Sequence, residues 1–468
     1  SFSAIAGNTH LIDFDLLTQM GLLKEADYAS VNFGDDPTSV DYERIFYARR
    51  PILETAVKNF LANQSLQADF NHFEKNNRLW LDDFAEFMAI KEHFGNQALQ
   101  KWDDKKAVAR DPKTLEKYRT MLTDQIQYFK VTQYFFFKQW SELKHYANQK
   151  GIKIIGDMPI YVAADSVEVW TKPELFQLDE ERNPLVVAGV PADQFSATGQ
   201  LWGNPLYAWE EHKKQGYAWW IHRIEESFKI YDVLRIDHFK GFSDYWQVDG
   251  KADIAKYGSW QPGPGYDLFK AVKEQLGDLP IIAEDLGNID DKARKLLADC
   301  NYPGMKILQF GFEDVSGKSL DSPHYCIPHS IVYTGTHDND VRRFIEKVVD
   351  CEVCNLVLVT YVQTLRICHV LRKVVDGAVL VGDSDVTLVH VAKVEADSVV
   401  VCHPHVKLHI HLRGVRRYVL RVVHEVVENV WLSAARRRYG LQRVLHNHVV
   451  ATCNHVKGRV HADRLAVS

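Results

Sequence analysis

Three short apolar segments of the chain each end in a carboxylate side chain. They occupy residues 233–237, 280–285 and 330–338, and their candidate acids are Asp237, Glu284 and Asp338. A continuous run of apolar residues is typical of a strand that is buried on both faces. Parallel barrels place their active sites at the carboxyl ends of such strands. The spacing therefore predicts a constellation of acids at one end of a sheet.

Paired carboxylates of this kind can break a glycosidic bond with retention of configuration. One ionised carboxylate attacks the sugar, and one protonated carboxyl, roughly 5–5.5 Å away, acts as acid and then as base. Alternation along a strand puts Arg235 and Asp237 on the same face, and a neighbouring guanidinium favours the ionised form that a nucleophile needs. Glu284 follows an apolar run, which favours the protonated form of an acid. The alternative is that Arg235 and Asp237 form a structural ion pair and that Glu284 only caps a strand.

Several longer strings make the chain similar to a known family. They are SAIAGNTHLID at 3–13, WLDDF at 80–84, GIKIIGDMPIY at 151–161, GQLWGNPLY at 199–207, YPGMK at 302–306 and YTGTHDND at 333–340. With these strings the chain resembles the amylomaltases (4-alpha-glucanotransferases, or disproportionating enzymes) of the alpha-amylase superfamily. The resemblance covers about residues 1–340 and does not extend into the tail, residues 341–468.

The resemblance implies roles for individual residues. It makes Asp237 the nucleophile, Glu284 the acid/base and Asp338 the acid that stabilises the transition state, with Arg235 and His337 as substrate-binding neighbours. It also implies an α/β fold, a (β/α)8 TIM barrel with inserted, mainly helical subdomains. Because the family has residues before the first one seen here, the first barrel strands are expected to be missing from this sequence.

The chain divides into three regions. Residues 14–148 carry apolar residues at helical spacing, with helices expected at 41–60, 82–94 and 114–146, and they are expected to form an inserted helical subdomain. The aromatic stretch at 134–140 is interpreted as core packing. Residues 149–340 alternate strands with helices, which predicts the catalytic barrel with parallel strands ending near Asp157, Asp237, Glu284, Phe310 and Gly335.

An insertion at about residues 161–217 is expected to cover the substrate. It is rich in Trp, Gly and Pro, and a loop of that length is more often functional than structural. Tryptophan and tyrosine offer a flat apolar face together with a polar atom, which suits sugar rings. The predicted substrate-binding residues here are Trp202 and Tyr207 for stacking and Asp193, Gln200 and Asn204 for hydroxyl groups.

Residues 341–468 are expected to close the barrel, but their sequence does not match the family. About a quarter of them are valine, and they carry more Lys and Arg than Asp and Glu although the whole chain has a net charge of −6. A foreign or frameshifted segment is one reading of such a break, wrongly identified residues are a second, and a divergent end is the third.

Composition excludes several classes of protein. The net charge of −6 argues against nucleic acid as the main partner, and no apolar run is long enough to span a membrane. Only two of the seven cysteines precede residue 341, which fits the cytoplasm. No metal and no cofactor are expected, since carboxylates supply the chemistry. The oligomeric state stays open.

The sequence thus predicts an enzyme, a 4-alpha-glucanotransferase. It would move α-1,4-glucan segments between maltooligosaccharides, as donor and acceptor, by a retaining double displacement. Two alternatives stay open: a retaining α-glucan hydrolase that uses the same acids, and a non-catalytic glucan-binding protein if the tail leaves the site incomplete.

Overall fold

The computed structural model describes residues 1–36, 38–192, 196–287, 289–313, 319–337, 398–403 and 406–410 of the 468-residue chain. The chain divides into two compact units, residues 1–336 and 337–468. In the second unit the described residues form one antiparallel pair, β10 (Ser398–His403) with β11 (Val406–Ile410). All other elements belong to the first unit.

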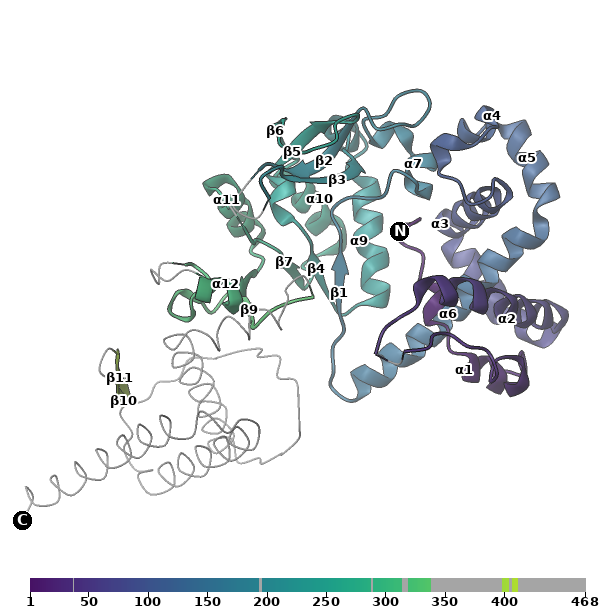
Figure 1. Ribbon diagram of the computed structural model, residues 1–468, viewed down its shortest axis with the longest axis horizontal. Coiled ribbons are helices and arrows are strands. Elements are labelled where there is room, and N and C mark those ends of the chain that lie inside the picture. The colour runs from purple at the N-terminus through teal and green to yellow at the C-terminus, as the bar shows by residue number, and fades with distance from the viewer. Residues whose placement is uncertain are drawn as a thin grey trace, which may run out of the picture. The chain divides into compact units, whose positions relative to one another are not determined.

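Six helices form the first part of that unit (Figure 1). They are α1 (Phe14–Gln19), α2 (Tyr42–Ala62), α3 (Gln67–His93), α4 (Lys105–Val108), α5 (Pro112–Met121) and α6 (Thr123–Gln149). Aspartates cap four of them; the Asp41 carboxylate, for example, accepts a hydrogen bond from the backbone N–H of Arg44. The helices expected at 41–60 and 82–94 are confirmed, although the second begins earlier, at Gln67.

The helix expected at 114–146 is two helices, because the backbone leaves the helical region at Leu122. The aromatic stretch at 134–140 packs in the core, as the sequence predicts. Tyr134, Phe135 and Phe136 are each less than 8 % exposed, and the Phe136 ring stacks on that of Trp140 at 6.0 Å.

A parallel sheet in the order β1-β4-β7 forms the centre of the second part (Figure 1). Its strands are β1 (Ile155–Met158), β4 (Val233–Ile236) and β7 (Ile281–Ala283). A second parallel pair, β8 (Gly304–Ile307) with β9 (Ser330–Tyr333), continues from β7, because the Ala283 N–H donates to the Pro303 carbonyl at 3.0 Å. The five expected strands are therefore present. The fourth ends at Ile307 instead of near Phe310, since helix α12 (Leu308–Glu313) starts at the next residue.

The two faces of these strands have different neighbours. Leu234, Ile236 and Ile281 belong to the main core together with residues of α9 (Ala218–Ile230), α10 (Tyr266–Leu276) and α11 (Asp291–Cys300). On the other face Ile282, Met305 and Ile307 form a separate cluster that Val233 and Tyr333 also join. One face thus packs against helices, and the other packs strand side chains against each other.

Tyr333 on β9 is influenced by charged groups on other parallel strands. Burial raises the pKa of Tyr333, the Arg235 guanidinium on β4 lowers it, and the Asp157 carboxylate on β1 raises it. The Tyr333 ring also packs on the cluster formed by Ile282, Met305 and Ile307.

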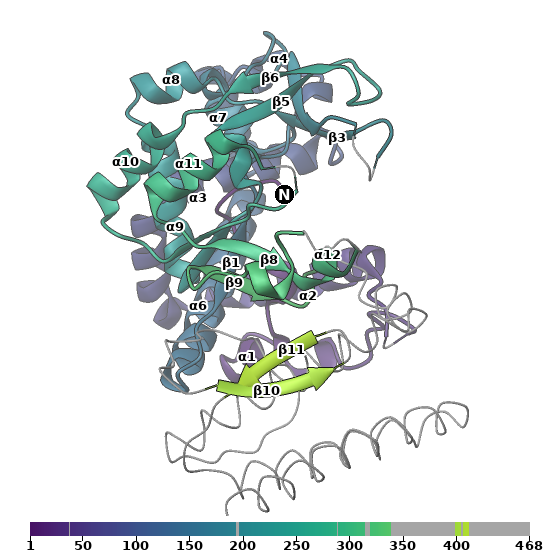
Figure 2. The same ribbon diagram turned by 90° about the vertical axis from the view of Figure 1, so that its left-hand side faces the viewer.

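An antiparallel sheet with the order β3-β2-β5-β6 lies next to the parallel strands (Figure 2). Its strands are β2 (Val186–Val190), β3 (Gln200–Pro205), β5 (Asp244–Asp249) and β6 (Gly258–Pro262). The insertion at 161–217, which the sequence suggests is a loop, contains regular secondary structure. It holds α7 (Val167–Thr171), α8 (Trp209–Lys214) and the strands β2 and β3, which pair with each other, and β2 also pairs with β5, a strand after β4. None of the helices in the described part of the chain is long and apolar enough to cross a membrane.

Candidate active site

Asp237 follows the last residue of β4, and two groups fix it. Its N–H donates to the Met158 carbonyl of β1 at 3.0 Å. Its Oδ1 lies 3.1 Å from Nη1 of Arg235, which confirms that the two side chains share one face of the strand. The same Nη1 donates to Oδ1 of Asp157 at 2.5 Å. Arg235 thus holds two carboxylates at the carboxyl ends of neighbouring strands.

Asp157 is a candidate site residue to which the sequence reasoning assigned no role. It is the next-to-last residue of β1 and follows the residues Ile-Ile-Gly, a pattern of apolar residues before an acid similar to the one that singled out the other carboxylates. Its side chain is 39 % exposed, and that of Asp237 is 41 % exposed, whereas Arg235 is buried. The two carboxylates therefore remain open to a ligand while their shared cation does not.

Glu284 follows β7 and is bound to the residues after Asp237. Its Oε2 accepts from the His238 N–H at 2.9 Å, and its backbone carbonyl accepts from the Phe239 N–H at 3.0 Å. Its Oε1 accepts from the Leu286 N–H at 2.8 Å. His238 has φ 50° and ψ 50°, a left-handed conformation that few residues other than glycine adopt. This turn directs consecutive N–H groups of the β4 strand end at Glu284.

The environment of Glu284 favours its protonated form. The pKa of Glu284 is raised to about 7, first by burial and also by the negative charge of Asp237, while the two backbone N–H groups and Arg235 oppose the shift. Near neutral pH this carboxyl group can therefore donate a proton, as the sequence predicts from its apolar strand.

We expect the activity to fall with increasing pH, because the acid role predicted for Glu284 requires its protonated form. With a pKa of about 7, kcat/KM for maltotriose should be level below pH 6 and fall about tenfold per pH unit above pH 8. Initial rates between pH 5 and 9 measure this limb. A constant kcat/KM up to pH 9 would contradict an acid role for Glu284.

The neighbouring acid, Asp285, has a structural function. Its Oδ1 accepts from the Met305 N–H at 2.6 Å, which ties β7 to β8. A Cβ atom on Gly304 would lie 2.5 Å from Oδ2 of Asp285, so only glycine fits there. The Met305 sulfur in turn lies 3.3 Å from Nε of Arg235. The segment 303–305 therefore supports the site through its contacts with Asp285 and Arg235.

Lys240 connects the two strand ends that carry Asp237 and Glu284. Its side chain is 11 % exposed, and its Nζ lies 2.6 Å from Oδ1 of Asp244 and 2.9 Å from Oδ2 of Asp290. Asp290 caps α11 by accepting from the Ala293 N–H. One ammonium group thus joins the segment after β4 to the helix after β7.

Replacing Lys240 by methionine should lower the free energy of unfolding by about 3 kcal/mol, because it leaves Asp244 buried without its cation. Lys240→Arg should keep most of the stability. Urea unfolding measures the difference. The control is Lys213→Met, which breaks an exposed pair with Asp267 and should cost at most about 1 kcal/mol. Equal losses in the Lys240 and Lys213 variants would show that the bridge adds no stability.

Trp202 on β3 approaches the strand ends from the antiparallel sheet. Its ring lies edge-on to the His238 ring at 4.8 Å and 6.2 Å from the Tyr161 ring, yet it stays 36 % exposed. Its Nε1 donates to Oε1 of Gln200 at 3.2 Å. Asn204 donates to the Val162 carbonyl at 2.8 Å. The structure thus brings Trp202 and its partner Gln200 to the residue that follows Asp237.

Tyr207 lies deeper than the sequence suggests. It is 1 % exposed, and its hydroxyl donates to the Ile160 carbonyl at 2.7 Å, so it supports the segment after β1. A substrate contact for it stays a prediction. Asp193 and Asp338 lie outside the described residues, and His337 is the first residue of the second unit.

The described ranges hold no group of three or more His, Cys, Asp or Glu side chains that could bind a metal ion. The site sets a carboxylate that is paired with a guanidinium beside a carboxyl group whose pKa is raised. Set at the carboxyl ends of parallel strands, this pair is typical of α/β enzymes that process sugars with retention of configuration.

Comparison with known proteins gives the family. A family model described as 4-alpha-glucanotransferase matches residues 1–379. The 4-alpha-glucanotransferase of Streptococcus pneumoniae serotype 4 is 54 % identical over 340 residues, which cover 73 % of this chain and 67 % of the relative. That of Thermus thermophilus is 41 % identical over 349 residues, again 73 % and 67 % of the two chains.

A solved structure agrees with the sequence comparisons. The amylomaltase from Streptococcus agalactiae in complex with acarbose has 59 % identity and a TM-score of 0.73, covering 74 % of this chain and 70 % of that one. The chain belongs to the 4-alpha-glucanotransferase family, and its activity is that of these enzymes, which are also called amylomaltases. The α/β fold is shared as well. The family match continues beyond residue 340, where the sequence reasoning ended it, to residue 379.

Proposed function

We propose that the enzyme transfers α-1,4-glucan segments by a double displacement in which Asp237 is the nucleophile and Glu284 the acid/base. Asp237 attacks the anomeric carbon, and the bond to the leaving oxygen breaks as Glu284 gives that oxygen its proton. Glu284 then takes the proton of an acceptor 4-hydroxyl, which attacks the same carbon and releases Asp237. Two inversions restore the α linkage.

The observation that carries this proposal is the opposite environment of the two acids. Asp237 lies 3.1 Å from a guanidinium that is itself buried, which favours its ionised form. Burial raises the pKa of Glu284 to about 7. Carboxylate pairs divide the roles of nucleophile and acid/base when their surroundings keep one acid ionised and its neighbour protonated.

Further residues complete the proposed site. Asp338 would stabilise the oxocarbenium-like transition state, with His337, Asp193, Gln200 and Asn204 as partners of sugar hydroxyls. Trp202 and the antiparallel sheet would cover the glycosyl-enzyme and keep water away, so that an acceptor sugar reacts first. The likeness to an amylomaltase solved with acarbose supports maltooligosaccharides and α-1,4-glucans as donors and acceptors.

We place this site in a (β/α)8 barrel. The parallel strands β1, β4, β7, β8 and β9, of which β4 and β7 pack one face against helices α9, α10 and α11, support that architecture. Residues 14–148 would be its helical insertion, residues 149–340 its catalytic part and residues 341–468 the part that closes it. The free thiols of Cys300 and Cys326 support a reducing, cytoplasmic location.

The test is incubation of the purified chain with maltotriose. A transferase should give glucose and a ladder of longer oligomers while the number of reducing ends stays constant. Proton NMR of the first products should show only α linkages. A steady rise in reducing ends without longer oligomers would instead indicate a hydrolase.

A further inference from the structure

The segment that follows β1 is held by three side chains from elsewhere in the chain. Residues 159–162 have no regular secondary structure. The Arg223 guanidinium donates to the Pro159 carbonyl at 2.6 Å and to the Ile160 carbonyl at 3.1 Å. The Tyr207 hydroxyl also donates to Ile160, and Asn204 donates to Val162. These carbonyls come directly after Asp157 and its neighbour Met158.

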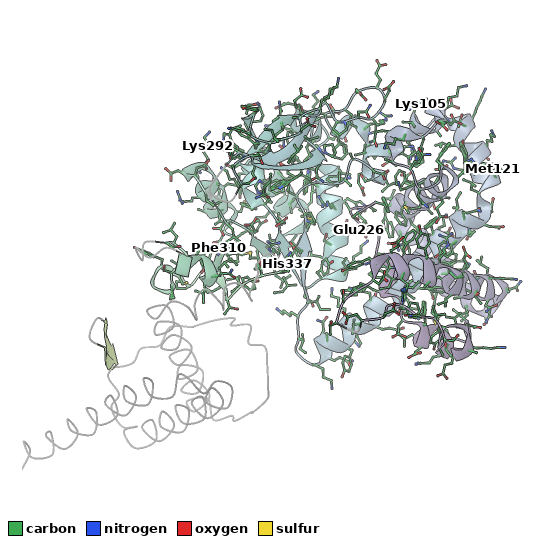
Figure 3. All side chains as sticks on the ribbon, in the orientation of Figure 1. Lys105, Met121, Glu226, Lys292, Phe310 and His337 are labelled. Atoms are coloured by element: carbon green, nitrogen blue, oxygen red, sulfur yellow. The ribbon has the colours of Figure 1, made fainter. Side chains whose placement is uncertain are left out.

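Arg223 is unusual because its buried guanidinium donates hydrogen bonds to backbone carbonyls. It lies on α9, the helix between the parallel sheet and the helical part, where Figure 3 labels Glu226 three residues further along. It is 3 % exposed, and its guanidinium lies 5.1 Å from the Trp220 ring. In the part of the chain that the structure describes, no carboxylate forms a direct ion pair with Arg223, although its charge opposes the rise that burial causes in the pKa of Glu168. Taking a cation out of water is costly, and the guanidinium compensates by binding the backbone carbonyls of residues 159 and 160 directly.

A chain of contacts connects Arg223, through Tyr161 and Trp202, to the residue that follows Asp237. Tyr161, inside the held segment, stacks on Tyr207 at 6.0 Å and lies 6.2 Å from the Trp202 ring. The Trp202 ring meets that of His238 at 4.8 Å, and His238 follows Asp237. A shift of the segment beneath Trp202 would therefore move a side chain that contacts the residue following the nucleophile.

We propose that Arg223 is a positioning residue that fixes residues 159–162 beneath Trp202 and thereby sets the partition of the glycosyl-enzyme between acceptor sugar and water. This rests on the proposed function, in which a covalent intermediate forms on Asp237. Both outcomes break the same ester bond. Transfer forms a new bond to a sugar 4-hydroxyl, and hydrolysis forms it to water, with Glu284 taking the proton in each case. The exclusion of water distinguishes transfer from hydrolysis, and this exclusion depends on the position of Trp202 above residues 159–162.

Two variants test the proposal. Arg223→Met keeps the volume and removes every donor, and Arg223→Lys keeps the charge but cannot reach both carbonyls in a fork. With maltotriose, the ratio of new reducing ends to oligomers formed should rise about tenfold in Arg223→Met, the factor that loss of a hydrogen bond to a charged group would give. The rise should be smaller in Arg223→Lys. The KM for a glucose acceptor should increase more than kcat falls.

The control is Arg119→Met, which breaks the pair of Arg119 with the buried Glu86 in the helical part. It should lower Tm and leave the partition ratio as in the wild type. If Arg223→Met changes Tm but not this ratio, Arg223 is structural and the proposal is overturned.

If Arg223→Met does not fold, Tyr207→Phe decides the question. It removes one donor to Ile160 and keeps the ring, and it should raise the ratio about threefold; an unchanged ratio in both Tyr207→Phe and Arg223→Lys overturns the proposal. Failure of the proposed function is separate, because the wild type itself would then form no oligomer ladder.

Discussion

The Asp237→Asn variant should lose transferase activity by a factor on the order of 10⁴–10⁶, the range seen when the nucleophile of a catalytic unit is removed. An amide has nearly the shape of the carboxylate, so β4 should keep its structure. The hydrogen bond from the N–H of residue 237 to the Met158 carbonyl should also remain. The amide cannot, however, form the glycosyl ester. The rate of oligomer formation from maltotriose at pH 6 measures the loss.

Sodium azide makes the same variant diagnostic of the role of Asp237. Azide can enter the space of the missing charge and attack an α-maltosyl fluoride directly, with fluoride leaving. One displacement should then give the β-maltosyl azide. The matched control is Asp267→Asn, which changes an exposed acid paired with Lys213 and should leave the activity within about twofold. If Asp237→Asn retained a tenth of the activity, Asp157, the other carboxylate on Arg235, would become the nucleophile to test.

Strand ends and side-chain alternation made much of the site predictable. The apolar runs located β4, β7 and β9, and alternation alone placed Arg235 and Asp237 on one face. The raised pKa of Glu284 also followed from its apolar strand, since desolvation is the first cause of the shift. These features depend on local sequence, and local sequence was sufficient.

Features that depend on distant residues could not be predicted in the same way. Nothing near Asp157 indicates that it shares the guanidinium of Arg235, which is 78 residues further along. Strands β2 and β5 pair although more than 50 residues separate them, so their stretch looked like a loop. A sequence pattern does not distinguish Tyr207 from Trp202, because both are aromatic residues with a polar atom. Packing in the structure shows that Tyr207 is buried and Trp202 is exposed.

Some local features also escaped prediction because the residue types are atypical. His238 adopts a left-handed turn that usually signals glycine. Helices α5 and α6 separate at Leu122 without a glycine or proline to mark the break. In the first case the turn supplies an N–H group that donates to Glu284, the proposed acid/base.

The second large effect concerns Glu284. Glu284→Gln should lower the rate with maltotriose about 10²–10⁴-fold, the contribution of a general acid/base. With α-maltosyl fluoride the first step should persist, because fluoride leaves without a proton, and the glycosyl-enzyme on Asp237 should then accumulate. Mass spectrometry of the intact protein would detect it as a maltosyl adduct.

Azide should release that adduct, since it attacks without a base, and the product should be the α-maltosyl azide after two inversions. This is the opposite anomer to the one expected from Asp237→Asn, so the pair of variants assigns the two roles independently of absolute rates. A β product from Glu284→Gln, or no adduct on Asp237, would contradict the assignment.

The same variant should be more stable than the wild type at high pH, which tests Glu284 without any substrate. Its folded pKa of about 7 lies above the ordinary value of 4.5. The folded state therefore binds more protons than the unfolded chain between these values, and stability falls as pH rises through this window. Glutamine does not titrate, so the Tm difference in favour of Glu284→Gln should grow from pH 4.5 to 7 and then stay constant. A difference independent of pH would mean that the carboxyl group is not desolvated, and its use as the acid at neutral pH would lose its physical basis.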